Sequence, residues 1–280
     1  MKTGPIVLLT DFGLQDAYVG MMKGVIAGIA PQTPIIDLAH DLPRGDIQRG
    51  AYHLWQATPF FPESSAFVVV VDPGVGTPRR ALGAAFPGFT CFAPDNGLLT
   101  YVCERCAPLK VVELTAPDYR IPNESATFHG RDIFAPAAAH LARGASLQDM
   151  GPPAAELTRL PLPSLSIDAD ATIRGQILFA DTFGNLITSL GLLHTEGENL
   201  VLDPWLGACS SARLKRRDVR AQLPDGTQLA ISRTFGDAGT GKPVAYVGSS
   251  GLLEIALNQG SAAEALGLSA GQEILLIRKG

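Results

Sequence analysis

Short apolar runs alternate with amphipathic stretches along roughly the first half of the chain. The runs are mostly β-branched and lie at residues 6–9, 34–36, 67–71 and 110–112. Continuous runs of this length fit strands that are buried on both faces of a largely parallel sheet. Residues 46–58 show helical spacing instead, with Ala51 and Leu54 on one face and Asp46 placed to cap the first turn. This alternation predicts an α/β layered domain with a mainly parallel sheet over residues 1–160.

The pattern changes after residue 150. Residues 151–169 are rich in proline and read as a linker. Beyond it, short β-type segments separated by turns lie at residues 173–179, 228–231, 244–247, 252–255 and 273–277. Such spacing predicts a small all-β barrel or sandwich over residues 170–280. With two domains, a ligand is expected in the cleft between them.

Composition and charge exclude several classes of protein. Hydrophobic residues make up 46% of the chain and charged residues only 18%, which argues against disorder. The formal net charge of −5 gives no basic footprint for nucleic acid, and the basic cluster at residues 213–220 reads as a solvated rim. No apolar run approaches the roughly 20 residues that span a bilayer, and the first run is too short for a signal peptide. We therefore expect a cytoplasmic enzyme or binding protein with no nucleic-acid or membrane partner.

The cysteines predict neither a metal site nor a redox site. Cys103 and Cys106 form a C-x-x-C pair, but no second pair completes a zinc set. The segment before them reads as a turn and not as the strand of a thioredoxin-like motif. We interpret these two, together with Cys91 and Cys209, as structural.

Two predicted strands end in an aspartate that a glycine-containing turn follows. Asp11 follows the first run and Asp72 the third. Ligands of open α/β sheets bind beyond the carboxyl ends of the strands, where a carboxylate can accept hydrogen bonds from the two hydroxyls of a ribose. The alternative is an aspartate that caps its own turn. Arg79 can reach back to Asp72 with bidentate geometry.

His129 is the one histidine with a setting that suggests chemistry. A helix is predicted to begin near Asp132 and to end before Gly144, which places His129 in the turn before its N-terminus. A histidine there can present one ring nitrogen to a ligand while a hydrogen bond fixes the other. A solvated loop histidine is the alternative. The remaining four histidines have no comparable setting.

In the second half, Asp181, Phe183 and Asn185 follow a predicted strand. This carboxylate, aromatic ring and carboxamide could hold an ammonium group and a flat heterocycle. An ordinary β-turn with a core phenylalanine explains the segment equally well. Residues 248–251 form a small-residue turn that could approach a carboxylate through hydroxyls and amides.

Six segments together carry a family resemblance. They are LLTDFGLQDAYVGMMKGVI, VVVVDPGVGTPRR, FAPDNGLLT, TFHGRDIFAPAAA, FADTFGNLITSL and SSGLLEIALNQG. In this order and at these spacings the sequence resembles the S-adenosylmethionine (SAM) hydrolase family, the SAM hydroxide adenosyltransferases, and is similar also to their halogenating relatives, the fluorinase and the chlorinase. The resemblance covers nearly the whole chain. It implies an N-terminal α/β domain, a C-terminal β-barrel and a homotrimer with sites at subunit interfaces.

The resemblance also implies a reaction and its residues. Water or hydroxide attacks C5′ of the substrate and gives adenosine and L-methionine, with no cofactor besides the substrate. The Asp-Arg-His constellation of the hydrolases falls on Asp72, Arg79 and His129. Halogenases typically carry tyrosine in place of the aspartate and the histidine, so this sequence resembles a hydrolase.

Seven further residues fall where the family binds its substrate. The resemblance assigns the ribose hydroxyls to Asp11 and the adenine edge to Asn185. The amino and carboxylate groups of the methionine part fall to Asp16, Asp181 and Ser249. The two faces of the adenine fall to Phe183 and Phe235.

Three positions depart from the halogenase pattern. Gly45 stands near the position where halogenases carry the tryptophan that covers the adenosine, Ser250 replaces an arginine at the carboxylate, and Leu257 replaces an arginine near the adenine.

Two other functions stay open. One is a chlorinase-like halide transferase, for which Gly130 leaves room although Asp72 would repel the anion. The other is a non-catalytic sensor that binds adenosine or SAM.

Overall fold

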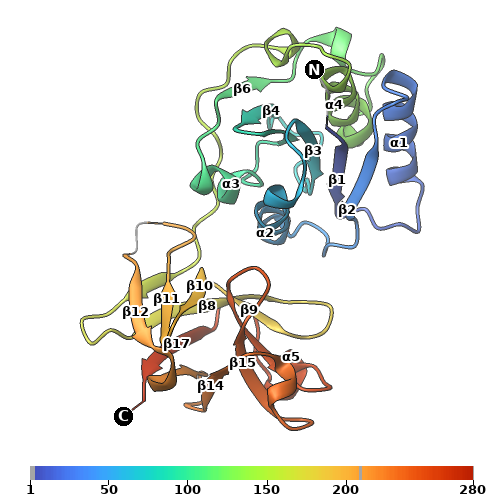
Figure 1. The fold of residues 1–280 in the computed structure, drawn as a ribbon. Helices are drawn as coiled ribbons and strands as arrows, with labels where there is room; N and C mark the ends of the chain where they lie inside the picture. The colour runs from blue at the N-terminus through green and yellow to red at the C-terminus, as the bar shows by residue number, and fades with distance from the viewer. Residues whose placement is uncertain (1–3, 208–209, 280) are drawn as a thin grey trace. The chain divides into compact units, whose positions relative to one another are not determined.

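The computed structural model describes residues 4–207 and 210–279 and divides the chain into two compact units, residues 1–160 and 161–280 (Figure 1). Cys209 lies outside the described residues. Each unit has a hydrophobic core of its own, which includes Leu8 and Phe134 in the first and Ile177 and Ile255 in the second. Within the described residues, no helix is both long enough and apolar enough to cross a membrane.

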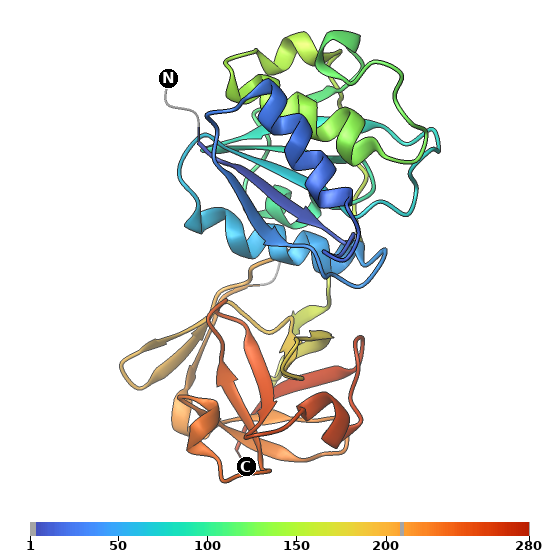
Figure 2. The ribbon, with the colours of Figure 1, turned by 90° about the vertical axis from the view of Figure 1, so that its right-hand side faces the viewer.

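The first unit is an α/β layered domain, as predicted. Its elements are β1 (Ile6–Thr10), α1 (Tyr18–Ile29), β2 (Ile35–Ala39), α2 (Ile47–Ala57), β3 (Ser65–Val70), β4 (Ala81–Phe86), β5 (Phe89–Pro94), α3 (Thr100–Arg105), β6 (Lys110–Glu113) and α4 (Ala135–Ala142). The strand order is β2-β1-β3-β5-β4-β6. Helix α1 packs against α4 over one face of the sheet, and α2 packs against α3 (Figures 1 and 2).

The sheet is parallel from β2 through β1 and β3 to β5, because these strands are joined by crossovers. Strand β4 departs from the predicted pattern, since it turns back at a hairpin and runs antiparallel to both β5 and β6. The expectation that every run is buried on both faces is wrong for β2. This strand pairs only with β1 and is partly exposed along its length because it forms an edge of the sheet.

The helix after His129 begins earlier than predicted. A π-helical turn over Gly130–Phe134 leads into α4, so Asp132 lies inside the helical segment, fully buried, and not at its start. The predicted cap of the other helix is confirmed, because the Asp46 carboxylate accepts a hydrogen bond from the Arg49 amide at 2.9 Å.

The predicted linker is exposed or half-buried along its length and contains the boundary between the two units, but parts of it pair with neighbouring chain. Residues 152–154 run beside β6, with hydrogen bonds from the Glu113 amide to the Pro152 carbonyl and from the Ala154 amide to the Val111 carbonyl. Farther on, residues 165–167 already form the first strand of the second unit. Proline here restricts the chain without preventing it from pairing with β6, because an edge strand tolerates a missing amide donor.

The second unit contains a closed barrel, as predicted. Its elements are β7 (Leu165–Ile167), β8 (Ile173–Ala180), β9 (Leu186–Thr188), β10 (Leu193–Glu196), β11 (Asn199–Leu202), β12 (Ala212–Lys215), β13 (Val219–Gln222), β14 (Gln228–Ser232), β15 (Pro243–Val247), β16 (Leu253–Leu257), α5 (Ala262–Leu266) and β17 (Glu273–Arg278). The order β17-β13-β14-β15-β16-β9-β8 closes through the pairing of β17 with β8. Strands β10, β11 and β12 form a separate small sheet that the sequence pattern did not predict.

Candidate active site

The two strand-end aspartates lie at one edge of the first unit's sheet. Strands β1 and β3 are parallel neighbours, with Thr10 opposite Val70 at their carboxyl ends. Asp11 follows β1 directly, and Asp72 follows β3 after one further residue. The carboxyl ends of parallel strands are where open α/β sheets bind ligands. The topology therefore supplies the setting that the sequence predicted for both carboxylates.

Arg79 joins Asp72 to His129. Its Nε donates to Asp72 Oδ1 at 3.0 Å and its Nη2 donates to Asp72 Oδ2, which gives the bidentate contact predicted from the sequence. The same Nη2 lies 2.7 Å from Nδ1 of His129. The side chain of Asp72 is only 4% exposed and that of Arg79 10%. The structure thus brings all three predicted catalytic residues into one connected group.

This contact fixes the proton on the His129 ring. A guanidinium has only donors, so Nδ1 of His129 must accept and the proton of the neutral ring sits on Nε2. Burial and, after it, the charge of Arg79 lower the pKa of His129 below its ordinary value of 6.5. The neutral ring can therefore offer an Nε2–H donor to a ligand at neutral pH.

The two loops that carry these residues approach each other closely. Gly76 has a φ of +79°, and a Cβ at this position would lie 2.8 Å from the carbonyl oxygen of Ala126. On the other side, the buried Asp132 accepts a hydrogen bond from the Ser125 amide at 2.8 Å. Glycine at position 76 therefore permits the contact between the Asp72 turn and the His129 loop, and Asp132 holds that loop in place.

Asn96 supports the site although the sequence pattern gave it no role. Its Nδ2 donates to the Val71 carbonyl at 2.9 Å, directly before Asp72. Next to it, Asp95 pairs with Arg80. The sequence did contain a signal for this role, namely the polar residues Asp95 and Asn96 immediately after the buried strand β5. That strand lies beside β3, but the sequence did not reveal this order.

Asp11 is partly engaged within the protein. Its Oδ2 accepts a hydrogen bond from the Gly45 amide at 2.8 Å, so the carboxylate holds the loop where halogenases carry their tryptophan. This contact reaches a distant loop, so it is not the cap of its own turn that the sequence left open as the alternative for Asp11. Asp16 is exposed in the loop before α1. The rings of Phe12 and Phe128 meet edge to face nearby, 5.9 Å apart.

His40 has a setting that the sequence did not reveal. Its Nδ1 lies 2.8 Å from Thr10 Oγ1 and its Nε2 lies 3.0 Å from Asp37 Oδ1. The His40 carbonyl also accepts a hydrogen bond from the Gly13 amide at 2.8 Å. This buried histidine therefore ties β2 to the end of β1 and to the loop that contains Asp11. This role of His40 can be recognised only once β1 is known to pair with β2.

In the second unit, Asp181 caps its own turn. Its Oδ1 accepts hydrogen bonds from the Phe183 and Asn185 amides, both at 2.9 Å, and its Oδ2 accepts one from Asn185 Nδ2 at 3.1 Å. The ordinary β-turn that the sequence left open as an alternative is therefore present. Phe183, however, is not a core residue, because it is 77% exposed.

The other predicted substrate residues of this unit are also exposed. Phe235 is 57% exposed, and its ring meets that of Tyr246 with 6.5 Å between centroids. Ser249 is exposed in the turn between β15 and β16. Exposed aromatic rings of this kind suit the faces of a planar heterocycle. The seven predicted binding residues thus divide between the units, with Asp11 and Asp16 in the first and the other five in the second.

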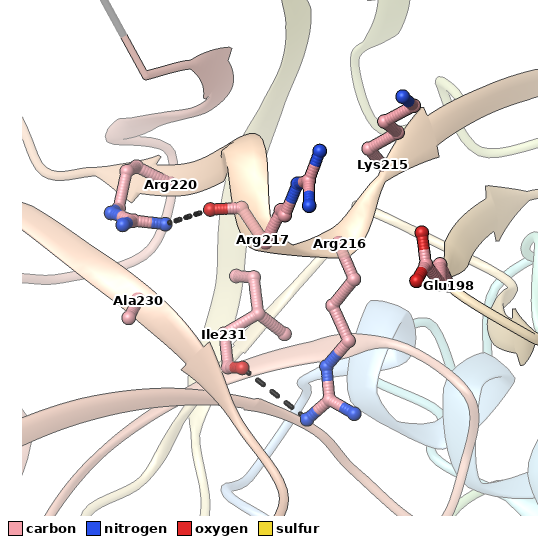
Figure 3. Close-up of a pocket in the computed structure, with 7 residues that line it drawn as sticks. All are labelled: Glu198, Lys215, Arg216, Arg217, Arg220, Ala230 and Ile231. Atoms are coloured by element: carbon pink, nitrogen blue, oxygen red, sulfur yellow. Dashed lines mark hydrogen bonds between the residues drawn. The ribbon is translucent and has the colours of Figure 1, made fainter.

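A pocket of about 480 Å³ lies over the basic cluster of the second unit (Figure 3). Its cations do not converge on one point. Arg216 donates to the Ile231 carbonyl at 3.4 Å, whereas Arg220 donates to the Arg217 carbonyl at 3.0 Å. Glu198 adds a negative charge to the lining. These two arginines donate hydrogen bonds to nearby backbone carbonyls, which fits the interpretation of the cluster as a solvated rim.

The described cysteines are buried or half-buried and free. Burial raises the pKa of the Cys103 thiol to about 11, and it also raises the pKa of Cys91 and Cys106. Thiols with such pKa values are poor nucleophiles at neutral pH. Among the described residues, no group of three or more histidine, cysteine or acidic side chains is arranged to hold a metal ion.

Comparison with protein families gives two matches that together cover most of the chain. The SAM hydroxide adenosyltransferase N-terminal domain matches residues 6–151, and the C-terminal domain of the same family matches residues 175–275. Each match falls within one of the two compact units.

Individual relatives agree with these matches. A protein named (R)-S-adenosyl-L-methionine hydrolase from Thermus thermophilus is 42% identical over 98% of this chain and 99% of its own. One of the same name from Salinispora tropica is 38% identical over 96% of each chain. A fluorinase from Nocardia brasiliensis is 30% identical over 95% of this chain and 94% of its own.

Solved structures show the same architecture. A crystal structure of a conserved protein from Thermotoga maritima superposes with a TM-score of 0.85 and 34% identity, covering 98% of this chain and 100% of the other. One from Thermus thermophilus gives a TM-score of 0.75 at 39% identity over 98% and 99% of the chains.

Proposed function

The chain belongs to the SAM hydroxide adenosyltransferase family, and from this premise we propose that it hydrolyses S-adenosyl-L-methionine to adenosine and L-methionine. The observation that carries the proposal is the connected group of Asp72, Arg79 and His129 at the carboxyl edge of the sheet. The higher identity to relatives named hydrolases than to one named fluorinase supports water over halide as the nucleophile.

In the reaction, the oxygen of water attacks C5′ in line with the departing sulfur. The C5′–S bond breaks, its electron pair stays on sulfur, and the water loses one proton to solvent. The leaving group is the neutral thioether of methionine, so the departing side needs no general acid. Catalysis is then mainly a matter of holding the water and C5′ in line, an effect that can lower a barrier by roughly 7–11 kcal/mol.

Arg79 and His129 hold the water in this proposal. The Nε2–H of neutral His129 and the guanidinium of Arg79 donate to two lone pairs of the hydroxide oxygen that forms as the water loses its proton to solvent, and the third lone pair points at C5′. A guanidinium near a sulfonium is repelled by it. The bidentate contact with Asp72 offsets that charge and fixes the direction of the guanidinium.

The substrate-binding roles remain proposals. Asp11 has one carboxylate oxygen engaged by Gly45, which leaves the other for the ribose hydroxyls. Asn185 uses its Nδ2 on Asp181, which leaves its carbonyl oxygen for the adenine edge. The exposed rings of Phe183 and Phe235 would cover the adenine faces. Asp16, Asp181 and Ser249 would hold the amino and carboxylate groups of the methionine part.

The name of the relatives suggests a stereochemical preference. In (R)-S-adenosyl-L-methionine the L prefix fixes the α-carbon, so the R prefix describes the sulfonium centre. We therefore propose that the R epimer at sulfur is the preferred substrate of this chain. Assays with the two separated epimers test this point, and equal rates would refute it.

Three further properties remain predictions: that no cofactor is needed, that the protein is cytoplasmic, and that it forms a homotrimer with sites at subunit interfaces. The neutral leaving group supports the first, because no metal or acid has to stabilise it. The third rests on the family resemblance.

Product analysis tests the proposed function against its alternatives. SAM is incubated with the protein in buffer with and without chloride, at low enzyme occupancy, and the products are separated by chromatography. A hydrolase gives adenosine and methionine in equal amounts under both conditions. Chlorodeoxyadenosine in the chloride sample would show a halide transferase, and tight adenosine binding without methionine release would show a sensor.

A further inference from the structure

Glu254 is a buried carboxylate behind the predicted substrate residues of the second unit. It lies on β16 opposite Tyr246 on β15 and is 8% exposed. Its Oε2 accepts a hydrogen bond from the Tyr246 hydroxyl at 2.6 Å. The Tyr246 ring in turn meets the ring of Phe235. Glu254 is thereby connected to one of the two aromatic side chains that would cover the adenine.

The other carboxylate oxygen lies against the turn that carries Ser249. A Cβ at position 248 would come within 1.8 Å of Glu254 Oε1, so only glycine fits above this oxygen. The turn is closed by hydrogen bonds from the Gly248 amide to the Leu252 carbonyl and from the Gly251 amide to the Gly248 carbonyl. Glu254 therefore lies directly beneath the backbone next to Ser249.

No cation neutralises this carboxylate among the described residues, where Glu254 makes no ion pair with any lysine, arginine or histidine. Burial raises the pKa of Glu254, and the negative charge of Asp181 raises it further. The hydrogen bond from the Tyr246 hydroxyl lowers it. A buried carboxylate without a neutralising cation is unfavourable, and a positively charged ligand relieves the cost of its desolvation.

We propose that Glu254 is a specificity-determining residue that, together with Asp181, favours the positively charged substrate over neutral adenosine. The inference rests on the proposed function, because it takes SAM as the ligand. SAM carries an ammonium, a sulfonium and one carboxylate, and therefore one net positive charge, whereas adenosine carries no charge. The carboxylate pair therefore attracts the substrate and loses this attraction once the C5′–S bond has broken, which keeps the nucleoside product from competing with substrate.

Glu254→Gln separates charge from structure. The amide oxygen still accepts from Tyr246 and the side-chain volume is unchanged, but the charge is gone. At pH 8 we expect the KM for SAM to rise about tenfold, while the inhibition constant of adenosine changes less than twofold and kcat less than threefold. Glu264→Gln, which removes an exposed charge from α5 of the same unit, should change none of these values.

A merely structural role predicts a different result. In that case Glu254→Gln resembles the wild type, whereas Glu254→Ala weakens SAM and adenosine equally, and this outcome would overturn the proposal. A measurement on the wild type keeps the test valid if the variants fail to fold. It compares binding of the cation 5′-dimethylsulfonio-5′-deoxyadenosine with that of neutral methylthioadenosine. Equal affinities would also overturn the proposal.

Failure of the proposed function is distinguishable from failure of this inference. If the wild type releases no adenosine from SAM, the proposed function is wrong. If the wild type hydrolyses SAM and Glu254→Gln keeps the wild-type KM, only the role of Glu254 is wrong.

Discussion

Arg79 is the residue on which the geometry of the site depends, because a single guanidinium contacts both Asp72 and His129. Its planar fork satisfies both oxygens of one carboxylate and still leaves Nη2 to donate to the imidazole. A lysine ammonium cannot reproduce these three contacts from one position. The direction of the guanidinium, and not only its charge, therefore determines where a water would be held.

We predict that Arg79→Lys lowers kcat by about 100-fold or more, while the KM for SAM changes less than threefold, because donors aimed at a developing charge act mainly in the transition state. Steady-state kinetics check this. Arg143→Lys, an exposed arginine of the same unit, is the matched control and should resemble the wild type. A rise in KM with unchanged kcat would show that Arg79 binds substrate and does not position water.

The histidine predicts a pH dependence. Burial and Arg79 lower the pKa of His129 below 6.5, so its neutral form persists to lower pH than that of an exposed histidine. Protonation removes the acceptor at Nδ1 and places a second cation beside Arg79. We therefore expect kcat to fall as the pH decreases, with a midpoint below 6.5. A pH–rate profile between pH 5 and 8 measures it, and a midpoint above 6.5 would contradict the assignment.

At the scale of elements, two loops meet over the edge of the sheet. The turn after β3 carries Asp72 and Arg79, and the loop before the π-helical turn carries His129. Gly76 and Ala126 are the residues at which they approach. The sequence predicted the Asp72–Arg79 contact because one turn contains both residues. It placed His129 there only through the family resemblance, because the contact joins residues far apart in the chain.

The contacts that the sequence missed share a physical cause. The roles of Asn96 and His40 depend on which strands are neighbours, namely β5 beside β3 and β2 beside β1. Local periodicity identifies strands but does not give their order. Glu254 was missed for a related reason, since it lies within an apolar strand and its partner Tyr246 is supplied by the neighbouring strand.

Gly76→Ala tests the meeting of the two loops. A methyl group at φ +79° would be strained and would push against the Ala126 carbonyl, so we expect a loss of roughly 1–2 kcal/mol of stability and a clear fall in kcat. Thermal unfolding and initial rates measure both. In Gly88→Ala, which has a φ of +89° but open space around it, stability should fall while kcat stays at the wild-type value. Equal kcat in the two variants would refute the coupling.

At the scale of the whole molecule, each unit holds a separate part of the predicted site. The first holds the connected group of Asp72, Arg79 and His129 at a sheet edge, and the second holds exposed aromatic rings and carboxylates on a barrel. The family matches follow the same division, with residues 6–151 and 175–275. The acidic balance of the chain, with a net charge of −5, suits a cationic substrate better than an anionic one.

The assembly can be tested in solution. We predict a mass of about three times the 29.5 kDa of one chain in light scattering after gel filtration. Mixing the inactive variants Arg79→Ala and Asp181→Ala during refolding should restore activity if a site takes residues from two subunits. A monomeric mass at full activity would refute the trimer.

A chelator tests the prediction that no metal ion takes part. After dialysis against EDTA, we expect the rate of SAM hydrolysis to match that of the untreated protein, because the thioether leaves without an acid and water is held by Arg79 and His129. A loss of activity that zinc or magnesium restores would contradict this prediction.

The oxygen of the attacking water can be traced from the solvent into the product. Wild type and His129→Ala are incubated with SAM in ¹⁸O-labelled water, and the products are analysed by mass spectrometry alongside SAM binding. We predict adenosine labelled at its 5′-oxygen, an equal amount of unlabelled methionine, and a rate at least about 100-fold lower in His129→Ala with similar affinity for SAM. Unlabelled adenosine, or full activity in His129→Ala, would contradict the proposed mechanism.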